Sequence, residues 1–239
     1  MDILINQPCG MGDVFFCQKI ADIVSQENNV YWPVDPNIWN NGADRIISKA
    51  NFGLQSDINI PSGQIGLLDL SNTPRKDPTE VMRCKYEYLG LDYSDWANYL
   101  KYNRDLEREN ELKQILGIVD NEPFILVNKF YSVYKPMNGV LEHLPKDYDG
   151  KIVHMDPTLQ RFNVFDWCWI FENAEEIHSV DTSIHYVIET LETKATKFLI
   201  HPRHYKYSPF VYTGLLKKPW QWIDYDRDTW KKLTPMEEE

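Results

Sequence analysis

The stretch NQPCGMGDVFFCQKIADIV, residues 6–24, decides the fold because it links an apolar strand to an amphipathic helix through two glycines and an acid. The apolar run at residues 2–6 predicts a buried strand, and residues 14–24 carry apolar side chains at helical spacing. Glycine lets a backbone approach a ligand closely, and a helix N-terminus favours an anion. The stretch therefore predicts a strand, a binding loop at Gly10, Met11 and Gly12, and Asp13 at the start of a helix.

The rest of the chain repeats this alternation of strands and helices. Ala43 to Ala50 fits a short helix or the start of another such step, and residues 79 to about 116 follow a helical pattern that is interrupted near Gly90. Strands alternating with helices predict parallel, doubly wound sheets, so we expect an α/β fold with domains at 1–118 and 119–239. Further strands are predicted at 29–34, 66–70, 123–128, 151–155, 176–180 and 197–200, and further helices at 163–173 and after 181.

The composition favours a globular protein and argues against several kinds of binding site. The chain has 239 residues, of which 43% are hydrophobic and 26% charged, as in ordinary globular proteins. Its formal net charge of -11 argues against binding nucleic acid through a broad basic surface, although a local basic pocket stays open. The four cysteines form no CxxC pair, so we expect reduced thiols and no metal site. No apolar run is long enough for a membrane span and the N-terminus lacks signal-peptide features, which predicts a soluble, cytoplasmic protein.

Further candidate residues follow the predicted strands, where open parallel sheets bind ligands. Asp181, Thr182, Ser183 and His185 follow a buried strand and could hold a diphosphate with hydroxyls and free amides, or simply cap a helix. Lys129 and Arg203 follow two other strands and could neutralise phosphate charge, although most such cations are solvated surface groups.

Two other site interpretations are weaker. The glycine loop resembles a dinucleotide-binding fingerprint, with Asp35 at the place of a ribose-binding acid, but Phe15 stands where the third glycine is required. The DYDRD motif, Asp224 to Asp228, resembles a metal-binding Asp-x-Asp pair, but it lies near the C-terminus and reads better as a solvated loop.

Two motifs together resemble those of a known family. The loop GMGDVFF and the segment NAEEIHSVDTSIH look like motifs of the GT-B glycosyltransferases, most closely of the heptosyltransferase group, with some likeness to the fucosyltransferases. The resemblance implies two Rossmann-like domains facing across a cleft, in a trimmed version because the chain is short. It also implies an N-terminal acceptor domain, a C-terminal donor domain that binds a nucleotide-sugar, and no obligatory metal or other cofactor.

The resemblance assigns roles to individual residues. Asp13 matches the candidate catalytic base, and Thr182 and Ser183 match positions near the donor diphosphate, with Ser183 replacing the usual glycine. Asp181 and His185 match the polar ends of the same motif. Lys129 and Arg203 lie where members of the family supply basic residues.

Two alternatives to a metal-independent glycosyltransferase stay open. The same fold could belong to a nucleotide- or sugar-binding protein without catalysis, which the short chain and Ser183 allow. A Rossmann-type oxidoreductase is the third possibility, and Phe15 disfavours it. The sequence leaves the acceptor open between a glycan, a small metabolite and a modified nucleobase.

Overall fold

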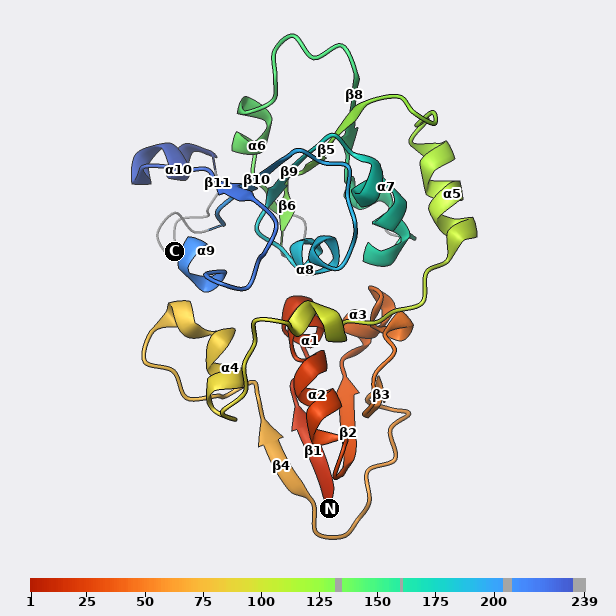
Figure 1. The fold of residues 1–239 in the computed structure, drawn as a ribbon, viewed down its shortest axis with the longest axis vertical. Coiled ribbons are helices and arrows are strands. Elements are labelled where there is room, and N and C mark those ends of the chain that lie inside the picture. The colour runs from red at the N-terminus through yellow and green to blue at the C-terminus, as the bar shows by residue number, and fades with distance from the viewer. Residues whose placement is uncertain (132–134, 160, 204–207, 234–239) are drawn as a thin grey trace. The chain divides into compact units, whose positions relative to one another are not determined.

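The chain divides into two compact units. The computed structural model describes residues 1–131, 135–159, 161–203 and 208–233. Unit 1 comprises Met1–Arg104 and Asn163–Phe165, and unit 2 comprises Asp105–Phe162 and Asp166–Glu239. This division precedes the expected boundary at residue 118, because α5 (Leu106–Ile115) packs against α7 (Cys168–Asn173) and so belongs to unit 2 (Figure 1).

Unit 1 is built on a parallel sheet in the order β3-β2-β1-β4. In the central strand β1, Ile3 aligns with Val30 of β2 on one side and with Gly66 of β4 on the other. The strands predicted at 2–6, 29–34 and 66–70 are confirmed, whereas β3 was not predicted. The strands are β1 (Asp2–Asn6), β2 (Asn29–Val34), β3 (Asn51–Leu54) and β4 (Gly66–Asp69).

The helix expected over residues 14–24 begins earlier and is broken. It consists of α1 (Met11–Phe16) and α2 (Gln18–Val24), which meet at Cys17, where ψ is 1°. Gly12 therefore lies inside the first turn of α1, and only Gly10 of the predicted loop has a left-handed φ, of +81°. The loop after β1 is shorter than the sequence indicated.

The helical pattern predicted over residues 79–116, with an interruption near Gly90, is broken at more places than expected. Gly90 has a φ of +66° and ends the first helical part, and Asp92 and Asp105 bind backbone amides in turns that separate the later ones. Local side-chain bonds of this kind compete with helix propagation. The helical segments of unit 1 after β2 are α3 (Pro36–Asn40), α4 (Arg83–Glu87) and the 3₁₀ turns η1 (Ala43–Arg45), η2 (Pro78–Glu80) and η3 (Trp96–Tyr99).

Unit 2 contains a parallel sheet in the order β11-β10-β9-β5-β8. The residues Val153, Leu126, Ile177, Phe198 and Trp220 align across its five strands. The strands predicted in the second half are confirmed, whereas β11 and the antiparallel pair β6–β7 were not predicted. The strands are β5 (Phe124–Asn128), β6 (Phe130–Tyr131), β7 (Lys135–Pro136), β8 (Lys151–His154), β9 (Glu176–Val180), β10 (Lys197–His201) and β11 (Trp220–Trp222).

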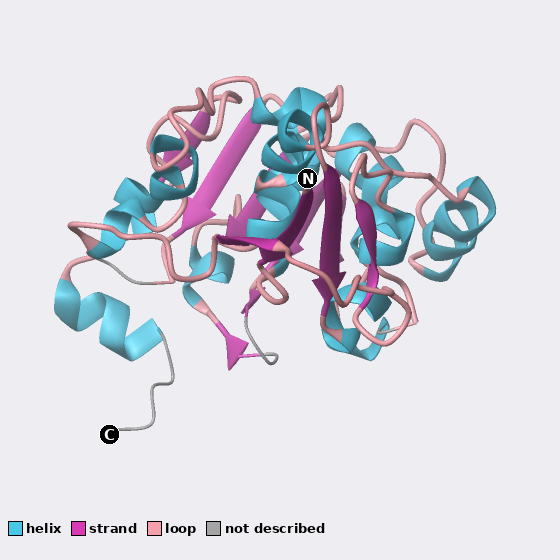
Figure 2. Ribbon diagram, turned by 90° about the horizontal axis from the view of Figure 1, so that it is seen from below, coloured by secondary structure: helices cyan, strands magenta, loops and turns pink. Residues whose placement is uncertain are grey.

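Helices lie beside the strands of the sheets (Figure 2). One side of the unit 2 sheet buries Ile125, Val127 and Val180 together with Tyr225 and Trp230 from the C-terminal part of the chain. The predicted segment 163–173 begins with a 3₁₀ turn, where Asn163 Oδ1 accepts from the Phe165 amide at 2.9 Å. The other helical segments of unit 2 are α6 (Gly139–Glu142), η4 (Pro157–Leu159), α8 (Ile184–Glu189), α9 (Ser208–Val211) and α10 (Arg227–Leu233), whereas the 3₁₀ turn η5 (Val164–Trp167) contains residues assigned to both units.

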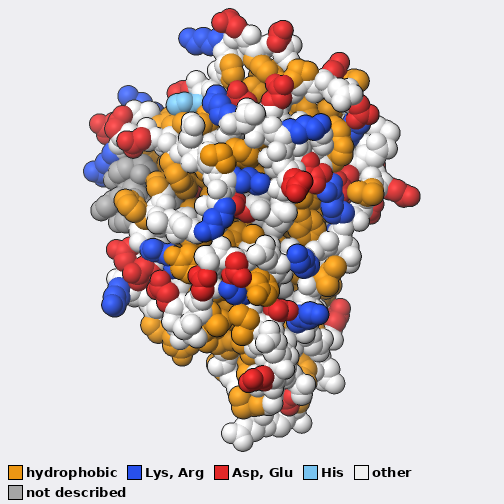
Figure 3. Space-filling model, in the orientation of Figure 1, with side chains coloured by type: hydrophobic (Ala, Val, Ile, Leu, Met, Phe, Trp, Pro, Cys, Tyr) orange, Lys and Arg blue, Asp and Glu red, His pale blue; other side chains and the backbone are white. Residues whose placement is uncertain are grey.

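The surface and the cysteines show ordinary features of a globular protein. Acidic and basic side chains are interspersed on the face drawn in Figure 3. All four cysteines carry free thiols, and three of them are buried. Within the described ranges, none of the helices combines the length and the apolar character that crossing a membrane requires.

Candidate functional site

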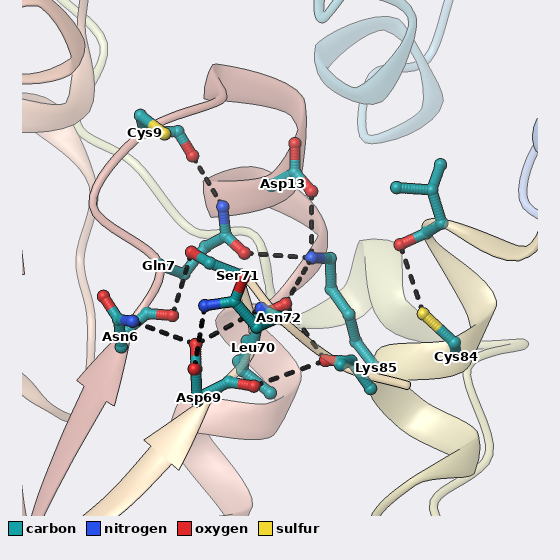
Figure 4. A network of polar contacts seen from close by, with 12 residues as sticks. Asn6, Gln7, Cys9, Asp13, Asp69, Leu70, Ser71, Asn72, Cys84 and Lys85 are labelled. Atoms are coloured by element: carbon teal, nitrogen blue, oxygen red, sulfur yellow. Dashed lines mark hydrogen bonds and ion pairs between the residues drawn. The ribbon is translucent and has the colours of Figure 1, made fainter. Parts of the chain in front are cut away.

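The first candidate site lies at the carboxyl end of β1 in unit 1 (Figure 4). The left-handed Gly10 turns the chain into α1, and the Gly10 carbonyl accepts from the Val14 amide at 2.9 Å. A Cβ atom at Gly10 would meet the carboxylate of Asp13, so a larger residue here would have to displace that side chain as well as adopt a left-handed φ. Asp13 thus sits in the first turn of α1 with its carboxylate directed back toward the loop.

Asp13 makes an ion pair that the sequence did not reveal. Its Oδ1 lies 3.1 Å from Nζ of Lys85, a residue of α4 whose side chain is 4% exposed, while that of Asp13 is 25% exposed. Asp13 stands in the first turn of α1, whose N-cap residue is Gly10. The sequence did contain a signal for this pair: Lys85 lies at helical spacing from the apolar Met82 and Leu89, on the face expected to be buried. A charge buried there is costly unless it has a partner of opposite charge.

The ends of β1 and β4 hold this lysine in place. Gln7 Oε1 accepts from Lys85 Nζ at 2.9 Å, and the Leu70 carbonyl accepts from it at 2.7 Å. Gln7 in turn donates from Nε2 to the Cys9 carbonyl at 2.6 Å, which links the network to the glycine loop. The glycine loop, two strand ends and α4 therefore form one polar network.

A second polar group extends this edge of the unit 1 sheet. Asp69 accepts from Asn6 Nδ2 and Asn72 Nδ2, each at 2.9 Å, and Ser71 Oγ donates to the Asn6 carbonyl at 3.1 Å. The bonds from Asn72 are the main reason that the pKa of Asp69 lies below its ordinary value. The edge presents a carboxylate, amides and a hydroxyl, groups that can bind the hydroxyls of a polar molecule.

The other predicted residues meet at the carboxyl edge of the unit 2 sheet. Lys129 follows β5, Asp181 to His185 follow β9, and Arg203 follows β10. These three strands are neighbours in the sheet and run parallel, so their following loops share one edge. The structure therefore gathers on one unit all six residues that the sequence analysis placed at the donor.

Asp181 and Arg203 form a pair within this edge. Asp181 Oδ1 accepts from the Arg203 amide, and Oδ2 lies 3.4 Å from Arg203 Nε. The Asp181 side chain is 2% exposed and that of Arg203 is 40% exposed. Burial opposes the charged form of Arg203, but the charge and hydrogen bond of Asp181 together with Tyr212 and Tyr186 outweigh burial, so the pKa of Arg203 is raised. Asp181 orients Arg203, whose exposed part can receive an anion.

His185, Thr182 and Ser183 differ in exposure. His185 is fully buried, packs against Trp220 with ring centroids 4.6 Å apart, and accepts at Nδ1 from the Thr182 amide at 3.3 Å. Burial, followed by the charge of Arg203, lowers the pKa of His185 to about 3, so its ring is neutral at pH 7. Thr182 and Ser183 are half-buried, and Thr182 Oγ1 accepts from the Ile184 amide at 3.4 Å. The buried His185 therefore supports the loop, whereas Thr182 and Ser183 are partly exposed to solvent.

Lys129 and a tyrosine complete this edge. Lys129 is half-buried, and its Nζ lies 5.3 Å from the centre of the Phe130 ring. Burial lowers the pKa of His154 at the end of β8, and the charge of Lys129 lowers it further. Tyr131, which the sequence analysis did not select, has a pKa raised by burial and lies close enough to Arg203 and Asp181 to respond to both charges. Because Tyr131 belongs to the unpredicted β6–β7 pair, only the folded chain identifies it.

The structure also describes the surroundings of Asp35 and of the DYDRD motif, the two weaker site candidates. Asp35 precedes α3, and its carbonyl accepts from the Ile38 and Trp39 amides at 3.0 Å. In the DYDRD motif, Asp226 accepts from the amides of Asp228 and Thr229, each at 2.9 Å, as a residue that begins α10 does. The Asp226 carboxylate therefore has a local role at a helix start, whereas Asp35 takes part in its helix start through its backbone carbonyl.

The fold is similar to that of a solved glycosyltransferase. The crystal structure of the glycosyl transferase family 9 protein from Veillonella parvula aligns with a TM-score of 0.60 and 11% sequence identity, over 94% of this chain and 86% of that chain. No family model matches this chain, and no curated protein matches its sequence. The chain therefore has a GT-B glycosyltransferase-like fold, as its motifs suggested.

Proposed function

We propose that this protein is a metal-independent glycosyltransferase that moves a sugar from a nucleotide-diphosphate sugar to an acceptor hydroxyl. The similarity of fold over 94% of the chain carries this proposal. The candidate residues support it, since they lie at the carboxyl edges of two parallel sheets, where open α/β folds bind ligands.

Asp13 is the proposed base. It would take the proton from the acceptor hydroxyl while that oxygen bonds to the anomeric carbon, and the bond from that carbon to the diphosphate would break with its electron pair. Its partial exposure leaves the carboxylate accessible to an acceptor. A positioned base contributes roughly 10²- to 10⁴-fold in rate.

The unit 2 edge is the proposed donor site. Arg203, oriented by Asp181, and Lys129 would neutralise charge on the departing diphosphate, and the hydroxyls of Thr182 and Ser183 would bind its oxygens. His185 would act only by supporting the loop, because its side chain is fully buried.

Titration calorimetry with a panel of nucleoside diphosphates tests the donor site. We expect selective binding of one diphosphate, with Kd raised about 10- to 100-fold in Arg203→Ala and less in Lys129→Ala and Thr182→Ala. Lys197→Ala is the matched control, since Lys197 begins β10 and pairs with Glu176 at the opposite edge of the same sheet. Equal affinity in all variants, or no binding by the parent protein, would remove the donor-site assignment.

A binding protein without catalysis is the second candidate. One oxygen of Asp13 is already engaged by Lys85, which favours a structural part for this carboxylate. Transfer of sugar from the diphosphate sugar that binds would separate the two functions. Binding without transfer to any acceptor of the panel would support the second.

A further inference from the structure

We propose, building on the function proposed above, that Lys85 is a positioning residue that holds the Asp13 carboxylate in the orientation it needs as a base. The pair joins the first turn of α1 to α4, two elements far apart in the sequence. Lys85 is too deeply buried to be a substrate-binding group, so its effect on the reaction would pass through Asp13.

The Lys85 ammonium has a full set of partners. It lies 3.1 Å from Asp13 Oδ1, 2.9 Å from Gln7 Oε1 and 2.7 Å from the Leu70 carbonyl. An ammonium group has three N–H donors, so these acceptors account for all of them. Gln7 and Leu70 directly follow β1 and β4, and the ammonium is therefore fixed to the sheet.

The two oxygens of the Asp13 carboxylate have different neighbours, and the side chain as a whole stays partly exposed. Oδ1 faces Lys85, whereas Oδ2 faces the left-handed turn at Gly10, where no Cβ stands in its way. A partly exposed aspartate without such a partner could change rotamer, which would spoil the alignment of the base with its proton. Lys85 thus restricts the rotamers of Asp13 and fixes the direction of its carboxylate.

Lys19 provides a matched control in the same unit. It is also a buried lysine, which donates to the Asp92 carbonyl at 2.6 Å and pairs with Asp95. Its partners belong to the turn before η3, whereas those of Lys85 lie at the strand ends and at Asp13. Loss of Lys19 therefore tests the effect of removing a buried lysine without touching the proposed base.

The experiment is a double-mutant cycle on turnover at a temperature where every variant is folded. We expect Asp13→Asn to lower kcat about 10²- to 10⁴-fold, and Lys85→Met to lower kcat about 10- to 100-fold, with the Kd of the donor and the KM of the acceptor unchanged. Lys19→Met should keep the kcat of the parent. Adding Lys85→Met to Asp13→Asn should cause no further loss, because Lys85 acts only through Asp13.

Several results would overturn the inference. Parent kcat in Lys85→Met, an equal loss in Lys19→Met, or full additivity in the double variant would each show that Lys85 does not position the base. If Lys85→Met does not fold, Gln7→Met removes one acceptor of the same ammonium, and a kcat equal to that of the parent would contradict the proposal in the same way.

The failure of the proposed function is separable from the failure of this inference. Full turnover by Asp13→Asn, or no transfer by the parent, would reject Asp13 as a base or the enzyme itself. A crystal structure of Lys85→Met, or of Gln7→Met, then decides the positioning claim by itself. An Asp13 carboxylate that moves away from the site of the ammonium supports the claim, and one that stays in place refutes it.

Discussion

Replacing Asp13 by asparagine should destabilise unit 1 as well as impair turnover. The substitution keeps the size of the side chain and a hydrogen-bond acceptor but removes the counter-charge of Lys85. The ammonium would stay buried among neutral acceptors, since the Lys85 side chain is 4% exposed. We therefore expect a loss in the free energy of unfolding that does not depend on any substrate.

The magnitude follows from the separation of the two charges. Unit charges 3.1 Å apart attract by about 5 kcal/mol at an effective dielectric constant of about 20. The 25% exposure of Asp13 screens part of this attraction, and the asparagine carbonyl recovers part of the hydrogen bond. Because breaking a buried pair costs about 3–5 kcal/mol, we expect a net loss of about 2–4 kcal/mol at pH 7.

Hydrogen exchange of the β1 and β4 amides is the suitable assay, because it reports on unit 1 even if the two units unfold separately. The double variant Asp13→Asn with Lys85→Met leaves no buried charge and should be more stable than Asp13→Asn alone. If these amides exchange as slowly in Asp13→Asn as in the parent protein, the buried Lys85 ammonium does not need the charge of Asp13 for stability. That result would refute the reasoning.

Three further predictions concern other parts of the chain. Burial lowers the pKa of His201 from 6.5 to about 3, so the unfolded chain binds this proton first as pH falls. The contribution of His201 to the unfolding free energy should be constant above pH 6.5 and fall by up to about 1.4 kcal/mol per pH unit between pH 6.5 and pH 3. Urea unfolding at pH 7 and pH 5 should show a smaller drop in His201→Gln, and an equal drop would contradict this origin. Arg108→Met removes the guanidinium whose Nε and Nη2 lie 3.1 and 3.0 Å from the buried Asp166 Oδ2. The free energy of unfolding should fall by about 3 kcal/mol, which calorimetry would detect as a lower Tm. An unchanged Tm would show that the other partners of Asp166 are enough to stabilise its charge. Gly10→Ala forces a left-handed φ on a residue with a Cβ and should cost about 1–2 kcal/mol in denaturant unfolding, whereas Gly63→Ala, which has open space, is the control that should match the parent.

The strands were the most predictable part of the fold. A strand buried on both faces needs a run of apolar residues, and Phe124–Asn128, fully buried in the structure, has such a run. Among the described residues, the edge strand Trp220–Trp222 pairs with β10 alone. It has three residues, one of them polar, which is too short a pattern to predict a strand. The short Asn51–Leu54 strand was missed for the same reason.

Helix lengths were less predictable because local and tertiary effects compete. Apolar spacing over residues 79–116 indicates helix on either side of Gly90, but turns at Asp92 and Asp105 divide the second part further into short segments. Each segment then buries its own apolar residues, such as Tyr86, which also donates to the Phe16 carbonyl at 2.5 Å. Spacing alone does not reveal where such a chain turns.

The sequence by itself determined the alternation of strands and helices, and with it the strand ends after which Asp13, Thr182 and Arg203 lie. These features depend on neighbours along the chain, which apolar spacing and turn residues encode directly. Only the tertiary structure decided that Asp13 pairs with Lys85 and that Asp181 pairs with Arg203. Both pairs join residues from separate elements, and the order and packing of those elements around each sheet bring the charges together.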